Sequence, residues 1–148
     1  PEGFNWSLEI SSNNLGYGAG HNFAISQAAS DYHLILNPDV YLDLYAIERC
    51  LDQMLATPDV ALITPQIIDN YEHTPHVAKR YPSLRVLAGR YLRRAGLFSE
   101  AQDRYIYRDV DARTSFEVEL AGGCFMFCRT KALRSVGGFD DQYFLYFE

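Results

Sequence analysis

The chain has 148 residues, 48% of them hydrophobic and 22% charged, fractions that are ordinary for one globular domain. Its formal net charge of −6 argues against nucleic acid as the main partner, because a phosphate backbone calls for a basic surface. The three cysteines, Cys50, Cys124 and Cys128, form no disulfide or zinc spacing, so a reducing compartment and a cytoplasmic location are expected.

The first predicted element is a short strand from Trp6 to Ser12, in which apolar and polar side chains alternate. A glycine-rich turn follows from Asn13 to Gly20, and a helix is predicted from Ala19 to Ala29. The run from Tyr32 to Leu36 is nearly continuous in apolar character, which is typical of a parallel strand covered on both faces. Pro38 ends this strand because proline lacks the N–H that a ladder needs.

The second half of the chain continues the alternation of helices and strands. Asp43 is predicted to cap a helix from Leu44 to Leu55, and Val60 to Ile68 is a further strand candidate. A basic amphipathic helix is predicted from Leu84 to Ala95, followed by strands from Phe116 to Leu120 and from Cys124 to Cys128. The last predicted element is a helix that Thr130 caps and that runs through Val136. Gly137 and Gly138 are predicted to terminate it. This order predicts an α/β fold with a mostly parallel sheet and flanking helices.

The tripeptide Asn37-Pro38-Asp39 is the sharpest local signal for chemistry. Ligands in open α/β sheets bind beyond the carboxyl ends of the strands, where Asp39 is expected to lie. A carboxylate there suits Mg²⁺ or Mn²⁺, since magnesium is commonly held by one or two carboxylates together with substrate phosphates. A plain strand-ending turn is the alternative, because all three residue types favour turns.

The glycine-rich stretch from Asn13 to Asn22 is the second signal. Glycines let a backbone approach a ligand closely, and the helix that follows presents N–H groups to an anion. A dinucleotide-binding fingerprint is the rival interpretation, and it fails at the third glycine position, which holds His21. Because the first two glycines and the following helix still match, a nicotinamide-dependent oxidoreductase stays open as an alternative function.

The C-terminal run from Gly137 to Glu148 is the third signal, since it combines three acids with five aromatic residues. Aromatic rings such as Tyr143 and Phe144 offer stacking surfaces for a sugar, and a carboxylate can serve as a general base. The candidate bases are Asp140, Asp141 and Glu148. A core-edge segment with solvated acids is the alternative.

A basic stretch stands out in this acidic chain. Residues Lys79 to Arg94 contain six cations and no acid. Two interpretations are open: peripheral contact with anionic lipid or a lipid-diphosphate acceptor at the inner membrane face, or a solvated helix face whose arginines pair with the protein's own acids.

Taken in order, four segments resemble glycosyltransferase family 2, especially its rhamnosyltransferase-like branch. They are Asn14 to Asn22, Leu36 to Val40, Ala121 to Met126, and Val136 to Glu148. The resemblance implies a GT-A-like (Rossmann-like) fold, here expected to be incomplete at both ends. It also implies a nucleotide-diphosphate sugar donor, a saccharide or lipid-linked acceptor, a divalent cation and inversion at the anomeric carbon.

The resemblance also implies roles for individual residues. Asp39 stands where the family places its metal motif, with Asn37 in place of the motif's first acid. The nucleotide is expected beside Asn14, Gly16, Asn22 and Asn37, and the donor sugar and acceptor beside Gly122, Gly123, Tyr143 and Phe144. Glu148 matches the Glu of the family's Glu-Asp pair, whose Asp is the catalytic base. We expect these 148 residues alone to have little activity, and a non-catalytic, transferase-like binding module is a further alternative.

Overall fold

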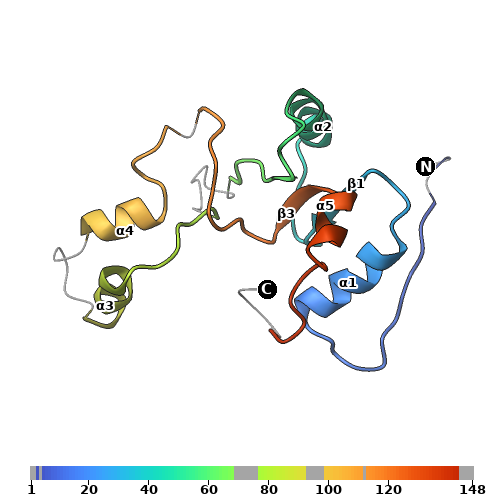
Figure 1. The fold of residues 1–148 in the computed structure, drawn as a ribbon, viewed down its shortest axis with the longest axis horizontal. Coiled ribbons are helices and arrows are strands. Elements are labelled where there is room, and N and C mark those ends of the chain that lie inside the picture. The colour runs from blue at the N-terminus through green and yellow to red at the C-terminus, as the bar shows by residue number, and fades with distance from the viewer. Residues whose placement is uncertain (1–2, 4, 69–76, 93–98, 112, 144–148) are drawn as a thin grey trace. The chain divides into compact units, whose positions relative to one another are not determined.

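The computed structural model describes residues 3, 5–68, 77–92, 99–111 and 113–143, without the side chains of 90–92 (Figure 1). In chain order its elements are α1 (Tyr17–Gln27), β1 (Tyr32–Leu36), α2 (Ala46–Ala56), β2 (Leu62–Ile63), α3 (Leu84–Leu92), α4 (Ser99–Tyr105), β3 (Phe125–Arg129) and α5 (Thr130–Ser135). The chain forms two compact units. Unit 1 comprises residues 1–33 and 129–148, and unit 2 comprises residues 34–128.

The three strands form one sheet in the order β1-β3-β2. Strand β2 pairs antiparallel with β3, so that Leu62 lies opposite Cys128. At the two ends of β1, the Asn37 N–H donates to the Cys124 carbonyl at 3.0 Å and the Thr130 N–H donates to the Asp31 carbonyl at 2.9 Å. Strand β3 therefore runs opposite to β1 as well.

The expectation of a mostly parallel sheet is thus corrected for the strands that the structure describes. An apolar run indicates that both faces of a strand are covered, and it carries no information about the direction of the neighbouring strand. Strands β1 and β2 do run the same way, but β3 lies between them in the opposite direction. The α/β character of the prediction is retained.

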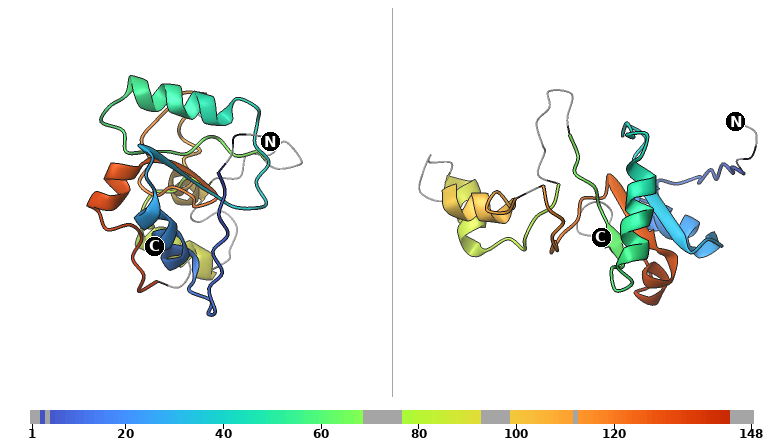
Figure 2. Two further views of the ribbon diagram at one scale, coloured as in Figure 1. Left: turned by 90° about the vertical axis from the view of Figure 1, so that its right-hand side faces the viewer. Right: turned by 90° about the horizontal axis from the view of Figure 1, so that it is seen from above.

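The core of unit 2 forms where α2 lies alongside the strands, as both views of Figure 2 show. The fully buried side chains are Ile35 on β1, Met54 on α2, and Phe125 and Cys128 on β3. Met54 and Cys50 are one helical turn apart, so they share the buried face of α2. Leu44, Ile47 and Leu55 also lie at helical spacing in the sequence, but all three are exposed.

Unit 1 is held together by α1 and α5, which pack against each other. The Arg134 guanidinium donates to the carbonyls of Ile25, Ser26 and Ala28 at the C-terminal end of α1, at 3.2, 3.2 and 2.5 Å from Nη2. The carbonyls of the last turn of a helix lack the usual N–H partner four residues further on, and a cation there also matches the helix dipole. Arg134 therefore fixes the C-terminal end of α1 to α5.

The end of α5 confirms the predicted glycine stop. Gly137 and Gly138 have φ of +85° and +81°, in the left-handed region that glycine favours. The Gly138 N–H donates to the Leu133 carbonyl at 2.9 Å, which closes the last turn. The predicted cap at Thr130 is wrong, because Arg129 occupies the N-cap position of α5. Tyr45 occupies the N-cap position of α2, and the Asp43 carboxylate accepts the Tyr45 N–H through Oδ1 at 3.0 Å in the turn just ahead of that helix.

Several predicted strands are absent or shorter than expected. Residues Trp6 to Ser12 form no strand, and Trp6, Leu8 and Ile10 are 84%, 72% and 83% exposed. Residues Phe116 to Leu120 contribute a single bridge between Leu120 and Lys79, and Val60 to Ile68 reduces to β2. Alternation gives a segment two faces, but a strand also needs a partner for its backbone.

The helices follow the sequence signals more closely than the strands do. The predicted helices of residues 19–29, 84–95 and 130–136 appear as α1, α3 and α5, with starts within two residues of those expected. Helix α4 was not predicted, because its residues are mostly polar and show no apolar period. Among the described residues, no helix is both long and apolar enough to cross a membrane.

Candidate functional site

The turn that carries Asp39 lies at the carboxyl end of β1, as the sequence predicts. Asn37 is the first residue after the strand, and its carbonyl accepts the Val40 N–H at 3.3 Å, which closes the turn around Pro38 and Asp39. The Asp39 carboxylate is exposed to solvent. An exposed carboxylate at the end of a strand is accessible to a ligand, and the strand fixes its position.

The same end of the sheet carries the second predicted segment, Gly122-Gly123. These glycines directly precede Cys124, whose carbonyl accepts the Asn37 N–H at 3.0 Å. A main-chain hydrogen bond therefore joins the turn of Asp39 to the segment of Gly122 and Gly123, although about 85 residues separate them in the chain. The structure thus brings these two predicted site segments of unit 2 together.

Gly122 has a packing reason to be glycine. A Cβ at this position would lie 3.0 Å from the Cβ and 3.2 Å from the carbonyl oxygen of Val77. Just beyond, Lys79 and Leu120 exchange two backbone hydrogen bonds of 2.9 Å, which hold the two segments side by side. The expected role of Gly122 and Gly123 beside the donor sugar stays a prediction.

The remaining described site residues belong to unit 1. The Asn14 side chain accepts the Gly16 N–H through Oδ1 at 3.0 Å, and Gly16 occupies the N-cap of α1 with φ of +83°. Asn14 therefore shapes the turn that leads into the helix. Its predicted position beside a nucleotide, together with that of Gly16, is untested.

Asn22 contacts the opposite end of the chain instead of standing free. Its Nδ2 donates to the Phe139 carbonyl and its Oδ1 accepts the Phe139 N–H, both at 2.8 Å. The Phe139 ring lies near Tyr17 and His21, with ring centroids 5.6 and 6.0 Å away. Burial, and to a lesser degree the nearby His33, lower the pKa of His21. The neutral imidazole is therefore the form that fits this aromatic cluster.

The acids of the C-terminal run follow immediately. Asp140, Asp141 and Tyr143 are exposed, and the Asp140 carboxylate accepts the Gln142 N–H through Oδ1 at 3.0 Å. Phe144 and Glu148 lie outside the described residues. The structure thus brings Asn22 close to the start of this run, and the catalytic role of the acids stays a prediction.

The donor set for a cation is small. Within the described ranges, no group of three or more His, Cys, Asp or Glu side chains comes together. Asp39 is the carboxylate at the end of β1, and Asn37 contributes an amide in place of a second acid. One carboxylate suits Mg²⁺ or Mn²⁺ only when a substrate diphosphate supplies further oxygens. The residues therefore fit a cation that binds together with the donor.

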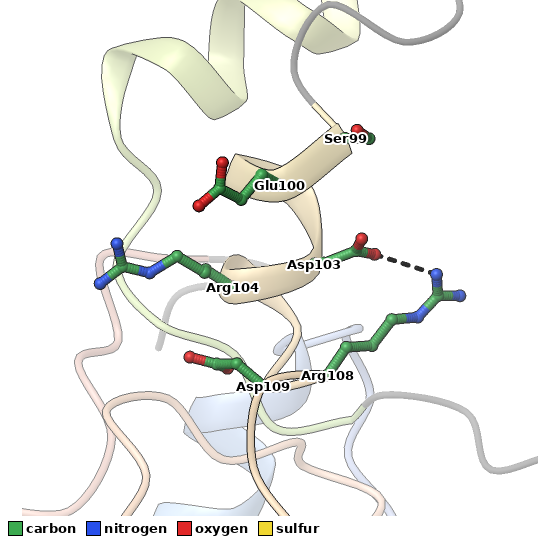
Figure 3. A pocket seen from close by; sticks show the side chains of 6 residues that line it. All are labelled: Ser99, Glu100, Asp103, Arg104, Arg108 and Asp109. Carbon is green, nitrogen blue, oxygen red and sulfur yellow. Dashed lines mark hydrogen bonds and ion pairs between the residues drawn. The ribbon is translucent and has the colours of Figure 1, made fainter.

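A shallow pocket of about 400 Å³ lies at α4 and the turn that follows it (Figure 3). Its walls are Ser99, Glu100, Asp103, Arg104, Arg108 and Asp109. The Arg108 guanidinium bonds the Asp103 carboxylate at 2.9 Å, so the opposite charges of the wall partly neutralise each other. None of the predicted site residues lines this pocket. The charged residues from Glu100 to Asp109 are the sequence feature that could have indicated it.

Arg80, in the basic stretch, pairs with one of the protein's own acids. Its guanidinium bonds the Asp109 carboxylate at 2.8 Å and the Arg104 carbonyl, and it lies 4.0 Å from the centre of the Tyr107 ring. The hydrogen bond from Arg80 lowers the pKa of Asp109 and raises that of Arg80. For Arg80 the pairing alternative is therefore correct. Membrane contact by the rest of the basic stretch stays a prediction, and Arg93 and Arg94 lie outside the described residues.

Comparison with known proteins decides among the candidate families. The model of glycosyl transferase family 2 matches residues 4–137. The chain belongs to this family. It is 28% identical, over 148 residues, to curated N-acetylglucosaminyl-diphospho-decaprenol L-rhamnosyltransferases of two Mycobacterium tuberculosis strains, CDC 1551 / Oshkosh and ATCC 25618 / H37Rv. The alignment covers 91% of the chain and 48% of each relative, so the chain spans about half their length. No solved structure gives a significant match.

Family membership confirms the resemblance that the ordered motifs carried. It favours sugar transfer over the nicotinamide-dependent alternative, which rested on an incomplete glycine fingerprint. The matched range includes both segments at the end of the sheet, the turn of Asp39 and Gly122-Gly123. It stops at Gly137, ahead of the acids of the C-terminal run.

Proposed function

We propose that this chain is part of an inverting, metal-dependent glycosyltransferase that transfers a sugar from a nucleotide-diphosphate sugar to a saccharide or lipid-linked acceptor. The observation that carries the proposal is the hydrogen bond between Asn37 and Cys124. It joins the exposed carboxylate turn of Asp39, at the carboxyl end of β1, to Gly122-Gly123, just ahead of β3, and both belong to segments that resemble the family.

Rhamnose is the proposed donor sugar, and a lipid-linked saccharide is the proposed acceptor. Support comes from the curated relatives, which are named as L-rhamnosyltransferases that act on N-acetylglucosaminyl-diphospho-decaprenol. A lipid-linked acceptor also accords with the proposed cytoplasmic location at the inner membrane face.

The proposed chemistry assigns a charge to each group. As the bond between C1 of the sugar and the diphosphate breaks, negative charge grows on the leaving group and positive charge on the sugar. Asp39 would hold the cation, and a bound Mg²⁺ or Mn²⁺ would neutralise part of the negative charge on the diphosphate. The acceptor hydroxyl oxygen forms the new bond to C1 from the face opposite the diphosphate. Its proton goes to a carboxylate of the C-terminal run, for which Asp140, Asp141 and Glu148 are the candidates.

Isothermal titration of the full-length protein with Mn²⁺ and a panel of nucleoside diphosphates tests the role of Asp39. In Asp39→Asn the side chain keeps its shape and loses its charge, so metal-dependent binding should weaken about tenfold or more, and turnover should fall on the order of 100-fold. Asp59→Asn is the matched control, since Asp59 is another exposed acid of unit 2 that lies in a turn after α2.

Three outcomes distinguish the alternatives. Tight, metal-dependent binding that survives Asp39→Asn unchanged would exclude Asp39 as the metal residue. Binding of NADH without any response to nucleotide sugars would favour the oxidoreductase. Nucleotide binding without turnover, by a full-length protein assayed against a panel of nucleotide sugars and acceptors, would favour a non-catalytic module.

A further inference from the structure

Asn22 and Phe139 make a two-point contact across 117 positions of the chain. The side-chain Nδ2 donates to the Phe139 carbonyl at 2.8 Å, and the Phe139 N–H donates to Oδ1 at 2.8 Å. A carboxamide presents a donor and an acceptor side by side, as a peptide group does. It can therefore hold both polar groups of one residue's main chain at once.

Glycine at position 138 is required by this contact. A Cβ at Gly138 would lie 2.2 Å from Oδ1 of Asn22, closer than any stable contact, whereas a Cβ at Gly137 would meet nothing within 4 Å. Both glycines have φ near +80°, so both resist a side chain on backbone grounds. They differ in their contact with Asn22.

The ring of Phe139 is held by the same helix as its main chain. Tyr17 meets the Phe139 ring at 81°, an edge-to-face arrangement, with centroids 5.6 Å apart. His21 lies 4.4 Å from the Tyr17 ring and completes the cluster. Helix α1 thus fixes Phe139 through a side-chain amide and two rings, and Asp140 is the next residue.

We infer that Asn22 is a positioning residue that holds the main chain at Phe139 and thereby sets where Asp140 and Asp141 lie relative to α1. The inference rests on the proposed function for the importance of these acids. It differs from the nucleotide contact that the family resemblance implies for Asn22, because here the amide acts through another segment of the protein.

Hydrogen exchange in the full-length protein tests the contact without any assay of activity. In Asn22→Ala the Phe139 amide loses its acceptor, so its exchange should accelerate about tenfold or more. In Asn22→Asp the second carboxylate oxygen replaces the Nδ2 donor and faces the Phe139 carbonyl, so exchange should accelerate there as well. Gln27→Ala, which shortens another amide side chain on α1, should leave the exchange of Phe139 unchanged. Equal protection in Asn22→Ala and the parent protein would overturn the inference.

Paired glycine variants test the geometry from the other side. Gly138→Ala should lower Tm more than Gly137→Ala, by several degrees, because only the former strikes Asn22. When Asn22→Ala is added to each, the obstacle is removed and the two variants should melt within about 1 °C of each other. Should Gly138→Ala fail to fold, folding restored by Asn22→Ala gives the same answer. A difference that persists without the Asn22 side chain would contradict the contact.

Kinetics and nucleotide binding then separate positioning from contact with the nucleotide. For a positioning role, Asn22→Ala should lower kcat on the order of tenfold while KM for the donor and the Kd of nucleoside diphosphates stay within about threefold. Weakened nucleotide binding with unchanged kcat would instead assign Asn22 to the nucleotide. An inactive parent protein would count against the proposed function. It would not affect the test of the Asn22–Phe139 contact, because hydrogen exchange and melting do not depend on turnover.

Discussion

Two regions of the molecule use polar side chains to organise the main chain, and they do so differently. In the α1–α5 corner (residues 13–33 and 129–143), three polar side chains each form hydrogen bonds with the main chain of one turn or helix end. They are Asn14, Asn22 and Arg134. In the α3–α4 region (residues 77–111), one side chain makes three contacts: Arg80 contacts the Asp109 carboxylate, the Arg104 carbonyl and the Tyr107 ring.

The backbone shows the same contrast. The corner takes its left-handed residues at glycines, Gly16, Gly137 and Gly138, where such angles cost little. The α3–α4 region takes one at Tyr107, with φ of +58°, although a tyrosine there is uncommon. Its hydroxyl accepts the Glu119 N–H at 3.0 Å, which helps to hold this backbone in place. Glycine patterns can be recognised in a sequence, whereas an arrangement around one arginine cannot.

The largest effect that distinguishes the regions is expected from Tyr105→Ala. Tyr105 ends α4 and is only 6% exposed, so its removal should destabilise the α3–α4 region by about 3 kcal/mol. Tyr81→Ala deletes the same ring from a site that is 69% exposed and should have little effect. Hydrogen exchange should accelerate across residues 99–111 and not across residues 17–33. Equal acceleration in both would mean that the two regions unfold together.

An intermediate effect is expected from Arg134→Ala in the corner. The side chain donates to three carbonyls at the end of α1, and hydrogen bonds to a charged donor contribute more than neutral ones, so a loss of about 2 kcal/mol is expected. Lys131→Ala removes an exposed cation from the same helix and serves as the control. Urea unfolding measures both. Equal midpoints for the two variants would contradict the anchoring of α1 by Arg134.

These contacts show how far the sequence could lead. The strand Tyr32–Leu36 was predicted with its observed bounds, because a continuous apolar run closed by proline is a local signal. The helix stop at Gly137 and Gly138 is also local. The strand predicted from Trp6 to Ser12 failed because alternation alone does not provide a backbone partner within the described chain.

The candidate site divides in the same way. The sequence placed Asp39 at the end of its strand, which needed only local signals. It could not reveal that Asn37 bonds Cys124, because this depends on the unforeseen antiparallel β3. The sequence also could not reveal the contact of Asn22 with Phe139. A family motif indicates which residues belong to a site, but it does not indicate which of them form hydrogen bonds with each other.

The smallest expected effect concerns pH and the corner. The pKa of His21 lies below its usual 6.5 in the folded protein, chiefly because of burial, so protonation favours unfolding. The stabilising contribution is present above pH 6.5 and is lost as the pH falls from 6.5 through the lowered pKa. His21→Phe keeps a ring against Tyr17 and Phe139 and should flatten this slope in urea midpoints measured from pH 8 to 5. An unchanged slope would point to His33, whose pKa burial also lowers.

The boundaries of unit 2 have a consequence for how such a protein can diversify. Leu34 and Cys128, its first and last residues, belong to neighbouring strands, so the polypeptide enters and leaves this unit at adjacent places. Insertions or deletions between them then leave the separation of the two ends unchanged, and lengthening a loop with fixed ends adds only a small entropic cost. The segment between β2 and β3 can therefore vary in length among related chains while the strands on either side stay in register.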